Sequence, residues 1–227
     1  MRQTGIDRKQ SPTAKIAAAY TPRKAPSRMV DFCLTINPDH ISPSDPDAVA
    51  IETHLRLGRH INHTSHEALQ RTPIAVSIET KRALIEGDTA QLQMGVWQSS
   101  LLRMLMRAEE ASSVLRAPEM QPPAAPPEET AAAPTAPTAP ATTPSEWLPG
   151  IIVQGHEWTF VATCRRNGSS QNKPTLLGSI RIGGTQEPLE VYCLMAAIAY
   201  LRTWAETRYW PGFKRCLLNS TGGEYTG

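Results

Sequence analysis

The sequence lacks the long apolar segments that accompany membrane insertion or export. No run of about eighteen apolar residues occurs in the chain, and the first twelve residues, MRQTGIDRKQSP, contain no apolar stretch of the kind found in signal peptides. Cysteine is also scarce: the four cysteines are far apart and form no C-x-x-C pair. The sequence therefore predicts an intracellular protein, in the nucleus or cytoplasm, with buried thiols and no membrane partner.

A strong net charge is absent as well, since the formal charge of +2 gives no overall attraction to nucleic acid or membrane. The charge is nevertheless uneven, because residues 1–28 carry seven Lys or Arg against the single acid Asp7. Two interpretations stay open for this basic segment: an arm that contacts phosphate, or a solvated terminus. Residues 1–12 are polar, and we expect them to be disordered.

Several catalytic motifs are missing. The sequence contains no G-x-x-x-x-G-K-[ST], no G-x-S-x-G and no H-E-x-x-H, which disfavours P-loop nucleotide hydrolysis, serine hydrolysis and zincin chemistry. His60, His63 and His66 step by three and could bind Zn²⁺ or Ni²⁺ from one side of a helix. The Asn, Ser and Thr residues around them indicate a loop instead.

Proline is concentrated in one segment. Residues 117–146 hold nine of the prolines within a Pro/Ala/Thr run that buries too little apolar area to offset the entropy of ordering. We expect a disordered, polyproline-leaning insertion there. It divides one domain into a first part, residues 13–116, and a second part, residues 147–218, and residues 219–227 form a flexible tail.

The hydrophobic pattern predicts alternating strands and helices. In the strand over 28–36, Val30, Phe32 and Leu34 share one face, which places Asp31 on the other face. Trp97 lies on the apolar stripe of a helix over 88–111 and is expected in the core. A short helix is expected before it, over 46–57. After it we expect strands over 151–153, 158–164 and 175–182, and then a helix over 187–209 that Pro211-Gly212 ends. The fold class is α/β (α+β), a mixed central sheet flanked by helices.

The strand Pro73–Lys81 carries the most informative residues. Ile74, Val76 and Ile78 alternate with small or polar residues, and Glu79 and Lys81 project together from one face. Glu79 and Lys81 could form a simple strand-end ion pair. Alternatively, Asp31 and Glu79 could hold Mg²⁺, or Mn²⁺, with Lys81 orienting water. Thr80 would point to the opposite face and offer only its carbonyl oxygen.

The second interpretation is strengthened by a resemblance. The run VDFCLTI, then NHT, PIAVSIETK, AQLQMGVW and LPGIIVQGHEW resembles the fungal PD-(D/E)XK nuclease-like family over about residues 13–210. The resemblance implies a restriction-endonuclease-like core. It gives Asp31 the motif aspartate, Glu79 the acidic position, Lys81 the lysine, and Gln91 an auxiliary polar position facing the site.

The chain departs from that family at its start. The family core opens with a helix packed on the sheet, and this leading helix is apparently missing from the sequence. Either the gene is shortened or degenerate, or a protein partner covers the exposed sheet face. An exposed apolar face would favour aggregation.

Two functions remain open. The first is a metal-dependent nuclease that hydrolyses phosphodiester bonds in DNA or RNA. The second is a catalytically inactive nuclease-fold binding or scaffold protein. Arg165, Arg166, Lys173 and Arg181 make the second half locally basic, which suits either a solvated hairpin or a nucleic-acid groove. Trp158 fits a core position better than a base-stacking one, and His156 could border the site.

Overall fold

The computed structural model describes residues 5–11, 13–22, 29–37, 46–82, 87–116, 146–165 and 173–218. Six of its strands form one sheet in the order β1-β2-β3-β4-β5-β6, with β3 and β4 parallel and every other neighbouring pair antiparallel. The strands are β1 Gly5–Gln10, β2 Phe32–Asn37, β3 Ile74–Lys81, β4 Trp147–Gln154, β5 Glu157–Arg165 and β6 Pro174–Gly184.

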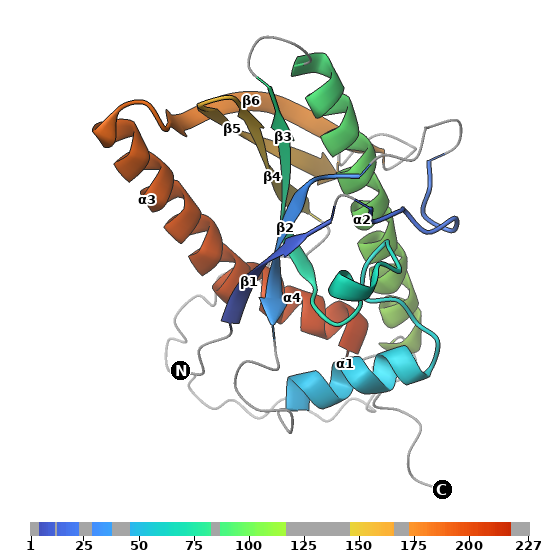
Figure 1. Cartoon of the computed structure of the whole chain (residues 1–227). Helices are drawn as coiled ribbons and strands as arrows, with labels where there is room; N and C mark the ends of the chain where they lie inside the picture. Colours follow the sequence, from blue (N-terminus) through green and yellow to red (C-terminus); the bar gives the residue numbers. More distant parts are fainter. Residues whose placement is uncertain are drawn as a thin grey trace, which may run out of the picture.

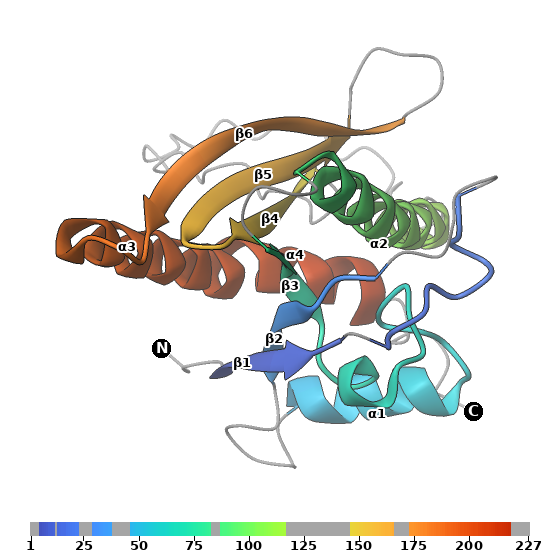
Figure 2. The same ribbon diagram turned by 45° about the horizontal axis from the view of Figure 1, so that its top comes forward.

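Helices flank this sheet on both sides. They are α1 Pro46–Arg56, α2 Gly87–Arg116, α3 Pro188–Trp204 and α4 Trp210–Phe213. Figures 1 and 2 show α2 on one side of the strands and α3 on the other. The predicted mixed central sheet flanked by helices is confirmed. None of the described residues before β2 is helical.

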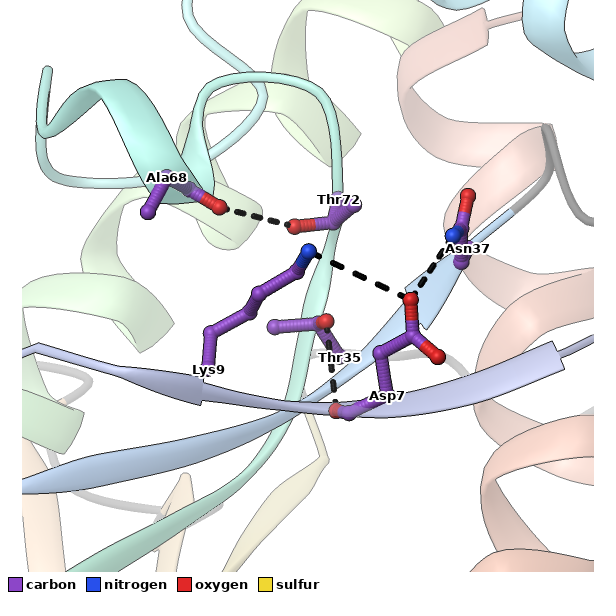
Figure 3. Close-up of polar contacts among 6 residues, drawn as sticks. All are labelled: Asp7, Lys9, Thr35, Asn37, Ala68 and Thr72. Carbon is purple, nitrogen blue, oxygen red and sulfur yellow. Dashed lines mark hydrogen bonds and ion pairs between the residues drawn. The ribbon is translucent and has the colours of Figure 1, made fainter.

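The N-terminal segment corrects one prediction, because residues 5–10 form a strand and are not disordered. Strand β1 pairs antiparallel with β2, placing Asp7 opposite Thr35. Asn37 Nδ2 donates a 2.7 Å hydrogen bond to Asp7 Oδ2, and Lys9 Nζ lies 4.0 Å from the same oxygen (Figure 3). The alternating apolar pattern is absent because β1 is an edge strand, where charged residues block pairing with further chains.

The C-terminal helix corrects another prediction, because Pro211-Gly212 does not end it. The chain continues from α3 through a π-helical turn, Ala205–Tyr209, into α4 and a second such turn, Lys214–Leu218. Pro211 lies in the first turn of α4. Proline in a continuous helix would clash with a carbonyl of the preceding turn, and a wider π turn relieves that clash. Tyr209, Trp210 and Phe213 are buried and favour the continuation.

Strand β2 is buried differently from its sequence pattern. Cys33 and Thr35 are fully buried, whereas Phe32 and Leu34 are only half-buried. The polar face of the strand therefore faces the interior. Strands covered by helices on both faces lose the simple alternation of buried and exposed residues. In β3 every residue from Ile74 to Glu79 is buried.

A close approach of α2 to the sheet occurs at Gly150 of β4. A Cβ atom there would lie 2.8 Å from Gln98 Nε2 and 2.9 Å from Met94 Sδ, both on α2. Gly150 pairs with Ser77 in the parallel register of β3 and β4. Side chains of paired residues share a face, so Ser77 and Glu79 project toward the side on which α2 packs.

The cysteines are free in the structure, but they are not uniformly buried as predicted. Cys33 is buried, and burial raises the pKa of its thiol to about 12. Cys193 is exposed, and the other two are half-buried. In the part of the chain that the structure describes, no helix is long and apolar enough to span a membrane. The predicted insertion, up to residue 145, and the tail over 219–227 lie outside the described residues.

Candidate active site

Strand pairing brings Asp31 and Glu79 together across two neighbouring strands. The antiparallel register of β2 and β3 pairs Phe32 with Ile78 and Cys33 with Ser77. Asp31 directly precedes β2, so this register brings it to the same end of the two strands as Glu79. The charge of Asp31 is close enough to raise the pKa of Glu79. Two carboxyl groups that are 48 positions apart in the sequence therefore lie near each other.

The Glu79 carboxylate is buried but incompletely bonded. Its side chain is 1% exposed, and Lys81 Nζ lies 2.7 Å from Oε1. Lys81 and the Asp31 backbone N–H are the hydrogen-bond donors to this carboxylate, although neither bond has ideal geometry. Burial raises the pKa of Glu79, and the nearby Asp31 charge raises it further, while Lys81 and the Asp31 backbone N–H act in the opposite direction. A buried carboxylate without full hydrogen bonding is costly and calls for another cationic partner.

Thr80 fixes the orientation of Asp31. Its backbone N–H donates to Asp31 Oδ2 at 2.8 Å, and its hydroxyl donates to the same oxygen at 2.5 Å. The prediction that Thr80 points away from the site, with only its carbonyl available, is wrong. Because the last residues of β3 run past the end of the β2 ladder, the Thr80 hydroxyl can reach back to Asp31. On the other side of Asp31, its carbonyl oxygen accepts a hydrogen bond from the Ser11 N–H at 2.9 Å.

Two glutamines near the start of α2 differ in direction. Gln91 is exposed and lines a surface hollow together with Pro22 and Leu176, so the structure does not place it beside Asp31. Gln93 is half-buried, and its Nε2 donates to the Met29 carbonyl at 3.3 Å, two residues before Asp31. Residues two apart on a helix point to nearly opposite sides, which explains why the choice between them could not be made from spacing.

The other candidates have structural roles. His63 is fully buried against Trp97, with ring centroids 4.2 Å apart, and burial lowers the pKa of His63 to about 3. His66 Nε2 lies 3.1 Å from the Thr13 hydroxyl. Among the described residues, no group of three or more His, Cys, Asp or Glu side chains could hold a metal, so the histidine metal site is not formed. The predicted core position of Trp97 is confirmed, as it is fully buried.

His156 and Trp158 flank the turn between β4 and β5. His156 Nδ1 lies 2.9 Å from the Thr185 hydroxyl in an exposed position. Trp158 is half-buried and packs against the edge of the hydrophobic core. The predicted core role of Trp158 is therefore confirmed in part, as a residue at the margin. Two of the predicted basic residues are paired with acids: Arg181 with Glu190 at 2.5 Å, and Arg165 with Glu109 at 3.8 Å. Arg166 lies outside the described residues.

Comparison with protein families identifies the family of the chain. A family model described as the PD-(D/E)XK nuclease superfamily matches residues 2–210. The chain belongs to the PD-(D/E)XK nuclease superfamily. The match begins before β1, so the first strand is part of the PD-(D/E)XK domain. Neither a comparison with curated proteins nor one with solved structures gave a match.

The residues of this PD-(D/E)XK site fit a divalent cation. Asp31 and Glu79 offer carboxylate oxygens, the ligands that Mg²⁺ and Mn²⁺ prefer. The Glu79 oxygens are buried, and Oε2 has no ion-pair partner among the described residues, so this oxygen is available to a cation. Lys81, whose side chain is 17% exposed, lies between this carboxylate and solvent.

Proposed function

We propose that the protein is a metal-dependent nuclease that hydrolyses phosphodiester bonds in DNA or RNA. The observation that carries the proposal is the buried Glu79 carboxylate, 2.7 Å from Lys81 Nζ at the end of β3, with the Asp31 charge close enough to raise the pKa of Glu79. Burial of a carboxylate near a second acidic group is costly unless further positive charge compensates it.

Each residue has a role in this proposal. Asp31 and Glu79 would hold Mg²⁺ or Mn²⁺, and Thr80 keeps Asp31 in place through two hydrogen bonds to one oxygen. A bound ion supplies Lewis-acid chemistry, lowering the pKa of a bound water and offsetting charge on the phosphoryl oxygens. Lys81 would orient the water that attacks phosphorus, and its ammonium would stabilise the growing negative charge.

Gln93 takes the auxiliary position in place of Gln91. It comes from α2, and its bond to the Met29 carbonyl ties the helix to the segment that leads into Asp31. A substitution of Gln93 should therefore lower activity by misplacing Asp31, whereas a substitution of Gln91 should leave the site intact.

The test is cleavage of labelled single-stranded and duplex DNA and RNA with Mg²⁺ or Mn²⁺. Wild-type protein should cleave at least one substrate, and Asp31→Asn, Glu79→Gln and Lys81→Ala should each abolish the activity. The matched control is Glu157→Gln, because Glu157 is an exposed glutamate of the same sheet, on β5. Absence of cleavage by the wild type, or equal activity in Glu79→Gln, would contradict the proposal.

One observation favours the alternative, a nuclease fold that binds without turnover. Only two carboxylates meet at the site, and no group of three acidic, His or Cys residues is present among the described residues. Titration calorimetry separates the two functions: Mn²⁺ binding that is lost in Asp31→Asn supports a working site. Absence of Mn²⁺ binding, combined with retained nucleic-acid binding, would favour the inactive protein.

A further inference from the structure

A surface hollow runs along α2, between this helix, Pro22 and Leu176 of β6. It has a volume of about 460 Å³, and its lining from α2 recurs at spacings of three and four residues, from Asp88 through Leu92, Val96 and Ser99 to Arg103. Pro22 and Leu176 form the remaining walls. The hollow begins in the first turn of α2, seven residues after Lys81 in the sequence. One end of it therefore belongs to the helix that directly follows the candidate active site.

A second hollow of about 800 Å³ continues from the first. The two share Pro22 and Arg103, and the second adds Tyr20, Arg107 and Lys173. Its lining contains three cationic side chains and no acidic one. Lys173 is exposed, and Arg103 makes no ion pair within the described part of the chain. An uncompensated cluster of cations of this kind is suited to a polyanionic ligand.

Arg107 gives this second hollow a defined wall. Its Nη1 donates to the Ala19 carbonyl at 2.9 Å, and its guanidinium lies over the Tyr20 ring at 5.6 Å from the centroid. The guanidinium is therefore held in position by the segment around Tyr20. A cation fixed in this way loses little conformational entropy when it contacts phosphate.

We propose that these two hollows form a track for a single nucleic-acid strand, with Arg103, Arg107 and Lys173 binding its phosphates. This inference rests on the proposed nuclease function, since the ligand it names is the substrate class of that function. From Asp88 to Arg107 the helix rises about 28 Å at 1.5 Å per residue. At about 3.4 Å per phosphate along a stacked strand, this length corresponds to about eight nucleotides.

The chemistry of the lining favours a single strand over a duplex. Leu92, Val96 and Leu176 supply apolar surface along the first hollow, and the unpaired bases of a single strand can be buried against such side chains. A duplex presents mainly sugar and phosphate to a protein surface. The apolar side chains of the track would therefore have no base faces to contact. Cations at one end and apolar residues along the track match a strand with exposed bases.

The test is binding of a labelled DNA strand of twelve nucleotides, measured by fluorescence anisotropy in EDTA so that cleavage does not interfere. The variant is Arg103→Ala with Lys173→Ala. The matched control is Arg202→Ala with Arg208→Ala, which removes the same charge from the region of α3, across the sheet. The Arg103→Ala, Lys173→Ala protein, called the pocket variant, should bind the strand at least tenfold more weakly than wild type. The affinity of the control should stay within twofold of wild type. Each lost phosphate contact should reduce the slope of log affinity against log salt by about 0.7.

Length and strandedness provide two further measurements. A strand of four nucleotides should bind at least tenfold more weakly than one of twelve, and a duplex of the same sequence should bind more weakly than the single strand. Equal loss of affinity in the control variant, or duplex binding as tight as that of the single strand, would overturn the inference. Thermal melting of every variant verifies that the fold is intact, and the exposed Lys173→Glu serves if Arg103→Ala unfolds.

The failure of this inference and the failure of the proposed function give different results. If Glu79→Gln abolishes cleavage but the pocket variant binds normally, the nuclease function stands and the track is refuted. If the wild type cleaves nothing but the pocket variant loses binding, the track stands and the hydrolytic function is refuted.

Discussion

Helices α2 and α3 lie on opposite sides of the same sheet, but they are packed very differently (Figure 1). One side of α2 is buried along much of its length, including Met94, Trp97 and Leu101. In α3 only Leu194, Leu201 and Trp204 are buried, and large apolar residues such as Tyr192 and Tyr200 are exposed, Tyr200 by 70%. Helix α2 is therefore packed more tightly than α3, and the candidate active site lies on the α2 side of the sheet.

This contrast shows how the fold holds a buried charge. Ser77 and Glu79 lie on the sheet face that α2 covers, where Gly150 permits close contact with Met94 and Gln98. A tightly packed wall keeps water out and holds side chains in single rotamers. The α3 side has no such requirement in the described structure, and its loose packing is compatible with the site.

The largest expected difference in stability comes from aromatic truncation on each helix. Trp97→Ala removes a fully buried indole and should lower the free energy of unfolding by about 3–5 kcal/mol. Tyr200→Ala on α3 should change it by no more than about 0.5 kcal/mol, because the side chain is exposed. Urea denaturation of both variants measures the difference. Similar losses would show that α3 is packed more tightly than the structure indicates.

Glu79→Gln should separate activity from stability. Cleavage should fall at least about a hundredfold, because a charged group at the reaction centre is lost. Stability without metal should rise at neutral pH, because burial raises the pKa of Glu79 in the folded state. The folded protein then binds more protons than the unfolded chain above the ordinary pKa of 4.5, so this group destabilises the fold as pH increases.

Denaturation in EDTA at pH 5 and pH 8 tests the stability part of this prediction. Wild type should lose more stability than Glu79→Gln between the two values. An equal change in both proteins would show that the Glu79 carboxylate is compensated in the folded state.

Two glycines should respond differently to a methyl group. Gly150→Ala places a Cβ within 2.8 Å of Gln98 Nε2 and should cost about 1–3 kcal/mol through overpacking. Gly178→Ala in β6 meets nothing within 4 Å and should stay within about 0.5 kcal/mol of wild type. Thermal melting of Gly150→Ala and Gly178→Ala measures the two effects. Equal losses of stability would show that the two glycines are packed equally tightly.

Acid should destabilise the α2 side through a buried histidine. Burial lowers the pKa of His63 from 6.5 to about 3 and that of His54 to about 4. Between pH 6.5 and these values the unfolded chain binds protons that the folded protein excludes, so stability falls as pH decreases. The slope is about 1.4 kcal/mol per pH unit for each histidine.

His63→Phe should make this dependence shallower. Neither ring nitrogen of His63 has a hydrogen-bond partner among the described residues, so the substitution breaks no hydrogen bond there and keeps an aromatic ring beside Trp97. Leu57→Phe is the control: it changes an exposed side chain without a titratable group and should leave the slope unchanged. An unaltered slope in His63→Phe would show that His63 is protonated in the folded protein.

Much of the candidate site could be predicted from the sequence. The period-2 pattern before Glu79 predicted one strand, and the alternation around Asp31 predicted another with Asp31 near its start; the structure pairs the two strands. The choice of Gln91 could not succeed from spacing, because the rotation of α2 about its axis depends on which residues pack against β3 and β4. Strand β1 could not be predicted from the sequence either, because its residues are mostly polar and show no alternation of apolar and polar side chains.

By itself, the sequence determined the succession of strands and helices, the family, and the acid, lysine and aspartate that form the candidate site. These features depend on local periodicity and on residue identity, and both can be seen directly in the sequence. The tertiary structure decided that Glu79 is buried without a full set of hydrogen bonds, that Thr80 holds Asp31, and that Gln93 approaches the site. These features depend on strand register and helix rotation, which follow from packing between residues far apart in the sequence.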